Sequence, residues 1–140
     1  MSRPRTYGPY VVLDTDVASL AFRDRLPATL AARLAGRTLC LSFVTVAEMT
    51  VWAEVRHWKP GNVAALHDWM RTFMRLPYDD DVATTWGRIQ AAAVLRGRPR
   101  PQNDTWIAAC CLERDIPLAT RNVRDYADFA EHDGLVLLTE

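Results

Sequence analysis

Short apolar runs alternate along the chain with longer segments in which apolar residues recur at helical spacing. The short runs are rich in aliphatic and β-branched residues and are bounded by polar or turn residues, which is typical of buried strands. They predict strands over residues 10–13, 39–43, 76–78, 116–119 and 135–138.

The segments between these runs have the periodicity of helices with one apolar face. A helix is predicted directly after Asp14, and others over residues 45–58, 62–73, 79–93 and 104–112, with a helical turn or two within 120–129. Pro60 and Gly61 break the second of these helices, and Asn62 is the expected cap of the next. Strands that alternate with helices predict a single α/β domain over residues 1–140, a three-layer sandwich with a mainly parallel central sheet flanked by helices.

Composition narrows the class of protein. With 49% apolar and 24% charged residues, the chain has the makeup of one compact soluble domain. Its formal net charge is zero, so any affinity for a nucleic acid must come from local clusters of charge. No apolar stretch approaches the roughly 20 residues of a membrane span, and no signal peptide is evident. Three cysteines without a CxxC pair indicate neither a disulfide framework nor a cysteine-ligated zinc site, so we expect a cytoplasmic protein.

Carboxylates follow several of the predicted strands. Asp14 ends the first strand, Glu48 lies just after the second, Asp104 begins a helix, and Asp125 follows the strand near Ala119. In an open parallel sheet, functional groups gather at the carboxyl ends of the strands. Oxygen ligands without a nearby histidine or cysteine favour Mg²⁺ or Mn²⁺ over zinc, and such ions support phosphodiester chemistry.

Each acid also has a purely structural interpretation. Asp14 and Asp104 stand where an aspartate commonly caps a helix, and so does Asp125. Glu48 lies within an apolar stretch, where an unpaired carboxylate would be costly to bury. Position along the chain does not decide between capping and a metal site.

Four segments together resemble the PIN-domain family, and specifically the VapC-type toxins of bacterial toxin–antitoxin pairs. They are residues 12–17 (VLDTDV), 42–49 (SFVTVAEM), 103–109 (NDTWIAA) and 119–126 (ATRNVRDY). Their order, spacing and flanking residues match across nearly the whole chain. The resemblance implies a Mg²⁺- or Mn²⁺-dependent endoribonuclease that cuts a structured cellular RNA, is inhibited by a VapB-type antitoxin and forms a homodimer. Asp14, Glu48 and Asp104 occupy the matching acidic positions.

The chain departs from the family pattern at two places. Asp16 stands where such toxins more often have a small polar residue, and the fourth acidic position falls on Asn122, with Asp125 three residues later. A carboxylate binds a hard cation more strongly than an amide oxygen does. We therefore expect Asp125 to serve a second ion or its waters, and Asn122 to orient a water or the scissile phosphate.

Arginines crowd the same motifs. These arginines are either solvated loop residues or a positive rim that anchors RNA phosphates. The candidates are Arg96, Arg98, Arg100, Arg121 and Arg124. The tryptophans of the middle helices are expected to be mostly core, while exposed ones would offer an apolar groove to an antitoxin or a dimer partner; they are Trp52, Trp58 and Trp69.

Two other functions remain open from the sequence. Asp14-Thr15-Asp16 after an apolar strand also resembles the nucleophile motif of haloacid-dehalogenase-like phosphatases, whose chemistry needs a lysine. Lys59 is the sole lysine and lies beside Pro60. Alternatively, the chain is a non-catalytic PIN-like binding scaffold in which the acids only cap helices.

Overall fold

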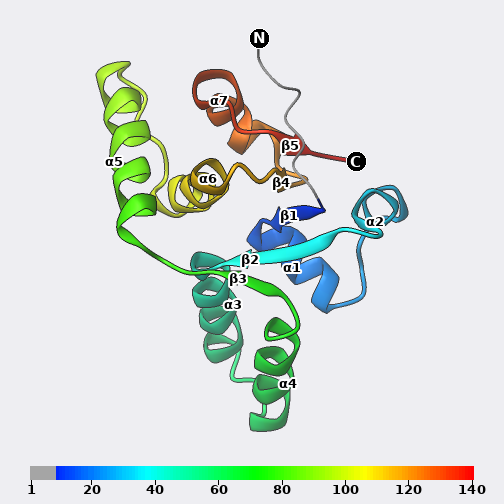
Figure 1. The fold of residues 1–140 in the computed structure, drawn as a ribbon. Coiled ribbons are helices and arrows are strands. Elements are labelled where there is room, and N and C mark those ends of the chain that lie inside the picture. The colour runs from blue at the N-terminus through cyan, green and yellow to red at the C-terminus, as the bar shows by residue number, and fades with distance from the viewer. Residues whose placement is uncertain (1–8) are drawn as a thin grey trace.

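The computed structural model describes residues 9–140, which form five strands and seven helices (Figure 1). In chain order the elements are β1 (Tyr10–Leu13), α1 (Thr15–Phe22), α2 (Ala28–Leu34), β2 (Thr38–Ser42), α3 (Phe43–Val55), α4 (Pro60–Met70), β3 (Met74–Leu76), α5 (Asp80–Leu95), α6 (Gln102–Arg114), β4 (Leu118–Ala119), α7 (Val123–Asp133) and β5 (Leu137–Leu138).

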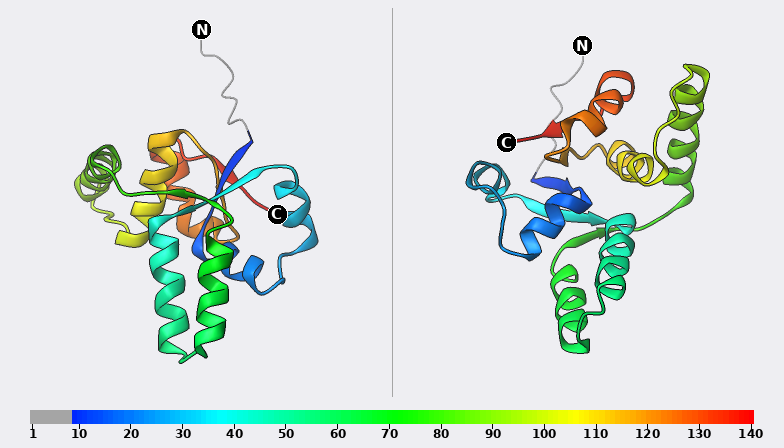
Figure 2. Two further views of the ribbon diagram at one scale, coloured as in Figure 1. Left: turned by 60° about the horizontal axis from the view of Figure 1, so that its bottom comes forward. Right: turned by 180° about the vertical axis from the view of Figure 1, so that it is seen from behind.

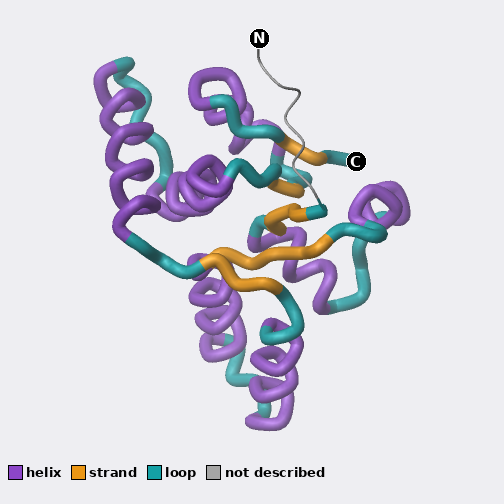
Figure 3. The backbone as a smooth tube through the Cα atoms, viewed as in Figure 1, coloured by secondary structure: helices purple, strands orange, loops and turns teal. Residues whose placement is uncertain are grey.

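The five strands lie side by side in one sheet in the order β3-β2-β1-β4-β5 (Figure 3). Every neighbouring pair is parallel. The central strand β1 pairs with β2 along its whole length and with β4 through Val12 and Leu13. Both faces of this strand are covered, because Val11, Val12 and Leu13 are fully buried. A strand buried on two faces is continuously apolar, and this is the pattern that predicted it.

Helices cover both faces of the sheet, so the predicted three-layer α/β sandwich is confirmed (Figures 1 and 2). One apolar core joins Val12 and Cys40 of the sheet to α5, α6 and α7. The other core joins Val11 and Leu13 to α1, α2, α3 and α4. Helices α3 and α4 lie side by side and project from the body of the molecule (Figure 2). Within residues 9–140, no helix is both long enough and apolar enough to cross a membrane.

Several element boundaries differ from the prediction. Strand β3 precedes Pro77, whereas the prediction began at Leu76; a proline lacks the N–H that a strand interior needs. Helix α4 begins at Pro60, whose fixed φ suits the first helical position, so the expected Asn62 cap is wrong. Helix α7 is longer than the turn or two expected, and α2 was not predicted at all.

The topology gathers the carboxyl ends of the strands beside β1. The chain passes from β1 to β2 and β3 on one side and returns to β4 on the other, which is the crossover where ligand sites form in parallel sheets. Helices α1, α3 and α7 begin at this edge because each follows a strand that ends there. Helix α6 leads back to the start of β4, so its own first turn also lies at this edge.

Candidate active site

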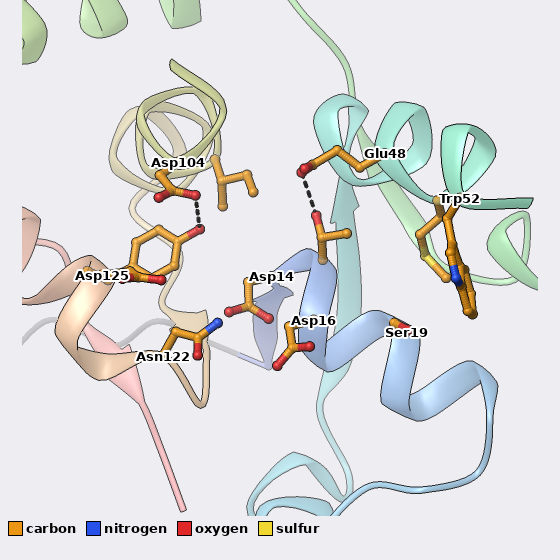
Figure 4. Close-up of a pocket in the computed structure, with 12 residues that line it drawn as sticks. Asp14, Asp16, Ser19, Glu48, Trp52, Asp104, Asn122 and Asp125 are labelled. Atoms are coloured by element: carbon orange, nitrogen blue, oxygen red, sulfur yellow. Dashed lines mark hydrogen bonds between the residues drawn. The ribbon is translucent and has the colours of Figure 1, made fainter. Parts of the chain in front are cut away.

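A pocket of about 340 Å³ lies at the carboxyl edge of the central strands (Figure 4). Polar side chains from the starts of three helices, α1, α6 and α7, and from α3 surround it. Those that the sequence singled out are Asp14, Asp16, Glu48, Asp104, Asn122 and Asp125. The structure therefore brings all five candidate catalytic residues to one cavity, together with Asp16.

Asp14 is both a helix cap and a wall of the pocket. Its Oδ1 accepts a hydrogen bond of 2.7 Å from the Val17 backbone N–H, and the side chain is almost fully buried. The pKa of the carboxyl is raised to about 6, chiefly by burial and to a lesser degree by the charges of Asp16 and Asp104, while hydrogen bonds from Thr120 and Val17 act in the opposite direction. Capping and a role in the pocket are thus compatible for this residue.

Glu48 is held at the end of a chain of hydroxyl groups. The Thr15 hydroxyl donates to Glu48 Oε1 at 2.8 Å and lies 3.0 Å from the Thr45 hydroxyl. Because the Thr15 hydroxyl donates its one proton to Glu48, it accepts the hydrogen bond from the Thr45 hydroxyl. Thr45 in turn lies 3.5 Å from the Ser42 hydroxyl, and Ser42 caps α3 by accepting from the Thr45 backbone N–H. These contacts fix the Glu48 carboxylate on the α3 side of the pocket.

Asp104 and Asp125 occupy equivalent places, each the third residue of its helix. Neither is a cap, since Pro101 precedes α6 and Asn122 precedes α7. Burial raises the pKa of Asp104, and the charges of Asp125 and Glu48 add to the effect. The phenol of Tyr126 opposes this rise of the Asp104 pKa by donating a hydrogen bond of 3.4 Å to Asp104 Oδ1.

The carboxylates surround the pocket but stand apart. Among residues 9–140, the group of three metal-capable side chains whose ligand atoms all lie within 4.8 Å of one another is Asp128, Glu131 and His132, outside the pocket. Asp128 in that group is already paired with Arg100. Like charges in a half-buried cavity repel one another, and a divalent cation would relieve that repulsion. A pocket lined by carboxylates and by no cationic side chain offers the oxygen ligands that hard divalent cations bind.

Asn122 and Asp16 lie on the open side of the pocket. Asn122 makes no capping bond with its side chain, and its amide points toward Asp14 (Figure 4). Its backbone N–H donates to the buried Thr120 hydroxyl at 2.9 Å. Asp16 is exposed in the first turn of α1. The amide is therefore free to meet a ligand next to the most buried acid.

Residues not selected from the sequence also contribute to the pocket. Tyr126 is 97% buried, and because burial strongly raises the pKa of its phenol, it keeps its proton and remains a donor to Asp104. Thr15 completes another part of the wall, beside Trp52, which the sequence had suggested for an apolar groove. Thr15 and Tyr126 lie inside the matched motifs, which is the signal that could have identified them. Lys59, the lysine required by the phosphatase interpretation, does not line the pocket.

One of the five arginines expected on a positive rim is misassigned. Arg100 is 7% exposed, and its guanidinium donates to Asp128 at 2.7 Å and to Asp133 at 2.5 Å while stacking over the Phe129 ring. With its donors enclosed, it is a structural residue and not an RNA contact. Arg96 lies 3.8 Å from the same Asp128.

The other arginines and the tryptophans are placed differently. Arg98 and Arg124 are exposed, and Arg121 pairs with Glu140. Of the residues described, no arginine lines the carboxylate pocket itself. Trp58 and Trp69 are half-buried against Phe22, as expected for core residues.

Comparison with known proteins gives consistent matches. The profile of the PIN domain family matches residues 11–134. The chain is 29% identical over 118 residues to Ribonuclease VapC2 of Haemophilus influenzae, covering 82% of this chain and 88% of that protein. It is 29% identical over 117 residues to the tRNA(fMet)-specific endonuclease VapC of Shigella flexneri, with the same coverage.

Solved structures show the same fold. The VapBC-1 structure from nontypeable Haemophilus influenzae superposes with a TM-score of 0.80 at 23% identity, covering 93% of this chain and 97% of that chain. The VapBC-5 structure from Mycobacterium tuberculosis has a TM-score of 0.70 at 25% identity and covers 95% of this chain. The similarity extends over nearly the entire sequence.

Proposed function

The chain belongs to the PIN-domain family, and from that membership we propose that it is an endoribonuclease, the toxin of a VapC-type toxin–antitoxin pair. The observation that carries this function is one pocket in which Asp14, Glu48, Asp104 and Asp125 converge from four different elements. Relatives that match over most of their length have ribonuclease and tRNA endonuclease names. The proposed reaction is hydrolysis of a phosphodiester bond in a structured cellular RNA.

The oxygen donors of the pocket support a Mg²⁺ cofactor, with Mn²⁺ as a substitute. Asp14, Glu48 and Asp104 would hold the first ion, and Asp125 would serve a second ion or its waters. When bound, such an ion lowers the pKa of a coordinated water and neutralises charge on the phosphate. A buried acid with a raised pKa, as Asp14 is, gains a partner for its charge by this means.

The remaining groups position the reacting ones. Thr15 holds the Glu48 carboxylate by its hydroxyl, and Tyr126 holds Asp104 in the same way. Asn122 would orient a water or the scissile phosphate, because its amide offers both a donor and an acceptor beside Asp14. The proposed hydrolysis requires no nucleophilic side chain, so these residues act on water and RNA through geometry and charge.

The test is cleavage of total tRNA in Mg²⁺ by wild type and by Asp14→Asn and Asp104→Asn. Both variants should lose at least 100-fold in rate while remaining folded, because an asparagine at position 14 can still cap α1 and neither change adds a charge. Asp81→Asn is the matched control, since Asp81 is an exposed acid of α5 outside the pocket. Wild-type chain without metal-dependent cleavage, or full activity in both variants, would contradict the proposal and favour a binding scaffold.

A VapB-type antitoxin and a second copy of the chain are the proposed protein partners. Helix α3 exposes Val51 and Val55, whose side chains are 60% and 69% accessible, near the half-buried Trp52 of the pocket wall. An antitoxin segment that covers this apolar face and places a cation near the carboxylates would block the site. Three cysteines that are free and buried support the proposed cytoplasmic location. Co-expression with the neighbouring gene product should abolish cleavage.

A further inference from the structure

A second cavity of about 560 Å³ adjoins the carboxylate pocket and shares two of its walls, Asp16 and Asn122. Its other lining residues include Arg121, Thr139 and Glu140. Both cavities thus border Asn122. A strand of RNA whose scissile phosphate reached the carboxylates would place a neighbouring nucleotide in this second cavity, whose volume lies within the range of roughly 300–1,000 Å³ seen for ligand sites.

The two cavities differ in charge. Acids line the first without a cation, whereas the second contains Arg121, the one cationic residue lining either cavity among those described. RNA phosphates need a positive partner that carboxylates do not supply. Of the five arginines predicted as RNA contacts, Arg100 is enclosed by Asp128 and Asp133. Arg121 is the candidate whose position is continuous with the proposed site of cleavage.

Arg121 forms an ion pair with Glu140 in the free protein. Its Nε donates to the Glu140 carboxylate, and both side chains are about two-fifths exposed. A guanidinium binds a phosphate with the same planar donors that it offers to a carboxylate, so the two ligands exclude one another at those donors. The exposed pair is weak enough to be exchanged.

We propose that this second cavity is the subsite for the nucleotide next to the scissile phosphate, that Arg121 binds its phosphate, and that Glu140 competes with RNA for Arg121. This inference rests on the proposed function, which identifies the bound nucleic acid as RNA. The subsite itself is a statement about RNA binding, which is measurable without cleavage. Glu140 then sets the affinity of the free enzyme for RNA.

The experiment measures binding of a fluorescein-labelled uridine decamer by anisotropy, in the Asp104→Asn background and across a range of NaCl concentrations. Arg121→Gln should weaken binding and reduce the slope of log K against log salt by about 0.7, the value for one phosphate contact on a single strand. Glu140→Gln should tighten binding about two- to fivefold, because it removes a competitor held by an exposed ion pair. Arg88→Gln is the charge-matched control on α5, where the arginine is exposed and lines neither cavity.

The double variant Arg121→Gln/Glu140→Gln decides the matter. The proposal requires the effect of Glu140→Gln to vanish when Arg121 is absent. If Glu140→Gln tightens binding equally in both backgrounds, Glu140 acts only as a general negative charge. If Arg121→Gln and Arg88→Gln give the same salt slope, Arg121 makes no phosphate contact. Either result overturns the subsite. Cleavage of tRNA by the wild-type chain is measured in parallel, so a failure of the nuclease function is recognised separately from a failure of the subsite.

Discussion

The hydroxyl of Thr15 donates a hydrogen bond of 2.8 Å to the carboxylate of Glu48. Thr15 directly follows Asp14, so this single contact ties the end of the central strand to α3, and it fixes two acids of the pocket relative to one another. The same hydroxyl accepts from Thr45 and so cannot rotate freely. The contact is therefore a means of orienting a proposed metal ligand.

Replacement of Thr15 by valine should raise the Mn²⁺ dissociation constant at least tenfold, because partners that orient metal ligands contribute on this scale. Isothermal titration with Mn²⁺ measures the change without reference to cleavage. Thr15→Ser is the matched control and should bind almost as well as wild type, since it retains the hydroxyl. Equal affinities for the valine and serine variants would show that the hydroxyl does not support the site.

The raised pKa of Asp14 predicts a pH-dependent stability in the absence of metal. The folded chain binds a proton on Asp14 up to about pH 6, whereas the unfolded chain releases it near pH 3.8, the ordinary pKa of an aspartate. Between these values the folded state holds more protons, so the free energy of unfolding must fall as the pH rises from about 4 to 6. The shift of roughly two pH units corresponds to an upper limit on the order of 3 kcal/mol.

Asp14→Asn removes this titration, so its stability relative to wild type should increase by about 2–3 kcal/mol between pH 4 and 7 in EDTA. Urea unfolding at several pH values measures the difference. Because the two chains share every other titrating group, a constant difference across that range would mean that Asp14 is not an unpaired buried acid.

Arg100 should be essential for stability and not for RNA binding. Its guanidinium holds the two α7 carboxylates Asp128 and Asp133, and its backbone pairs with the Gln90 side chain of α5. Arg100→Met leaves the Asp133 carboxylate, whose side chain is 9% exposed, without its cation, whereas the more exposed Asp128 keeps Arg96 and His132 nearby. The variant should therefore lower the free energy of unfolding by about 3 kcal/mol. Arg98→Met, an exposed neighbour in the same loop, should cost less than about 0.5 kcal/mol. Similar urea midpoints for the two variants would contradict this assignment.

Replacement of Asn122 and replacement of Asp125 should have different effects on cleavage. Asp125 has a negative charge that attracts a cation, so Asp125→Asn should raise the Mg²⁺ concentration needed for half-maximal cleavage. Asn122→Ala should instead lower the rate at saturating Mg²⁺, because the amide would orient a water or the phosphate. Titration of cleavage with Mg²⁺ distinguishes the two. If only Asn122→Ala shifts the metal requirement, the roles are reversed.

The sequence located the acids because their places follow from local pattern and parallel topology. An apolar strand that ends in Asp14 and helix starts that precede Asp104 and Asp125 are visible in a few residues, and a parallel sheet brings such positions to one edge. The fold class follows from the same alternation of runs. These features depend on neighbours in the chain and on general rules of handedness and order.

Contacts between side chains that are far apart in the sequence could not be predicted from local pattern. Arg100 is four residues from Asp104, which suggested a rim of the site, whereas its partners Asp128 and Asp133 are 28 and 33 residues away and give no signal near position 100. Helix α2 has seven residues, too few for its periodicity to stand out. The Tyr126 contact to Asp104 likewise spans 22 residues and depends on how α6 packs against α7.

The position of β1 at the centre of the sheet has a consequence for synthesis of the chain on the ribosome. Both neighbours of β1 come later in the sequence, and β4 at Leu118–Ala119 comes more than 100 residues after it. Until that segment has emerged, one edge of β1 stays open, and Asp14 lacks its backbone bond to the Ala119 carbonyl. Asp104 and Asp125 are also supplied only by this late part of the chain. A nascent chain therefore lacks the assembled cavity until β4 and the start of α7 have left the ribosome, and the proposed cleavage of RNA must wait for them.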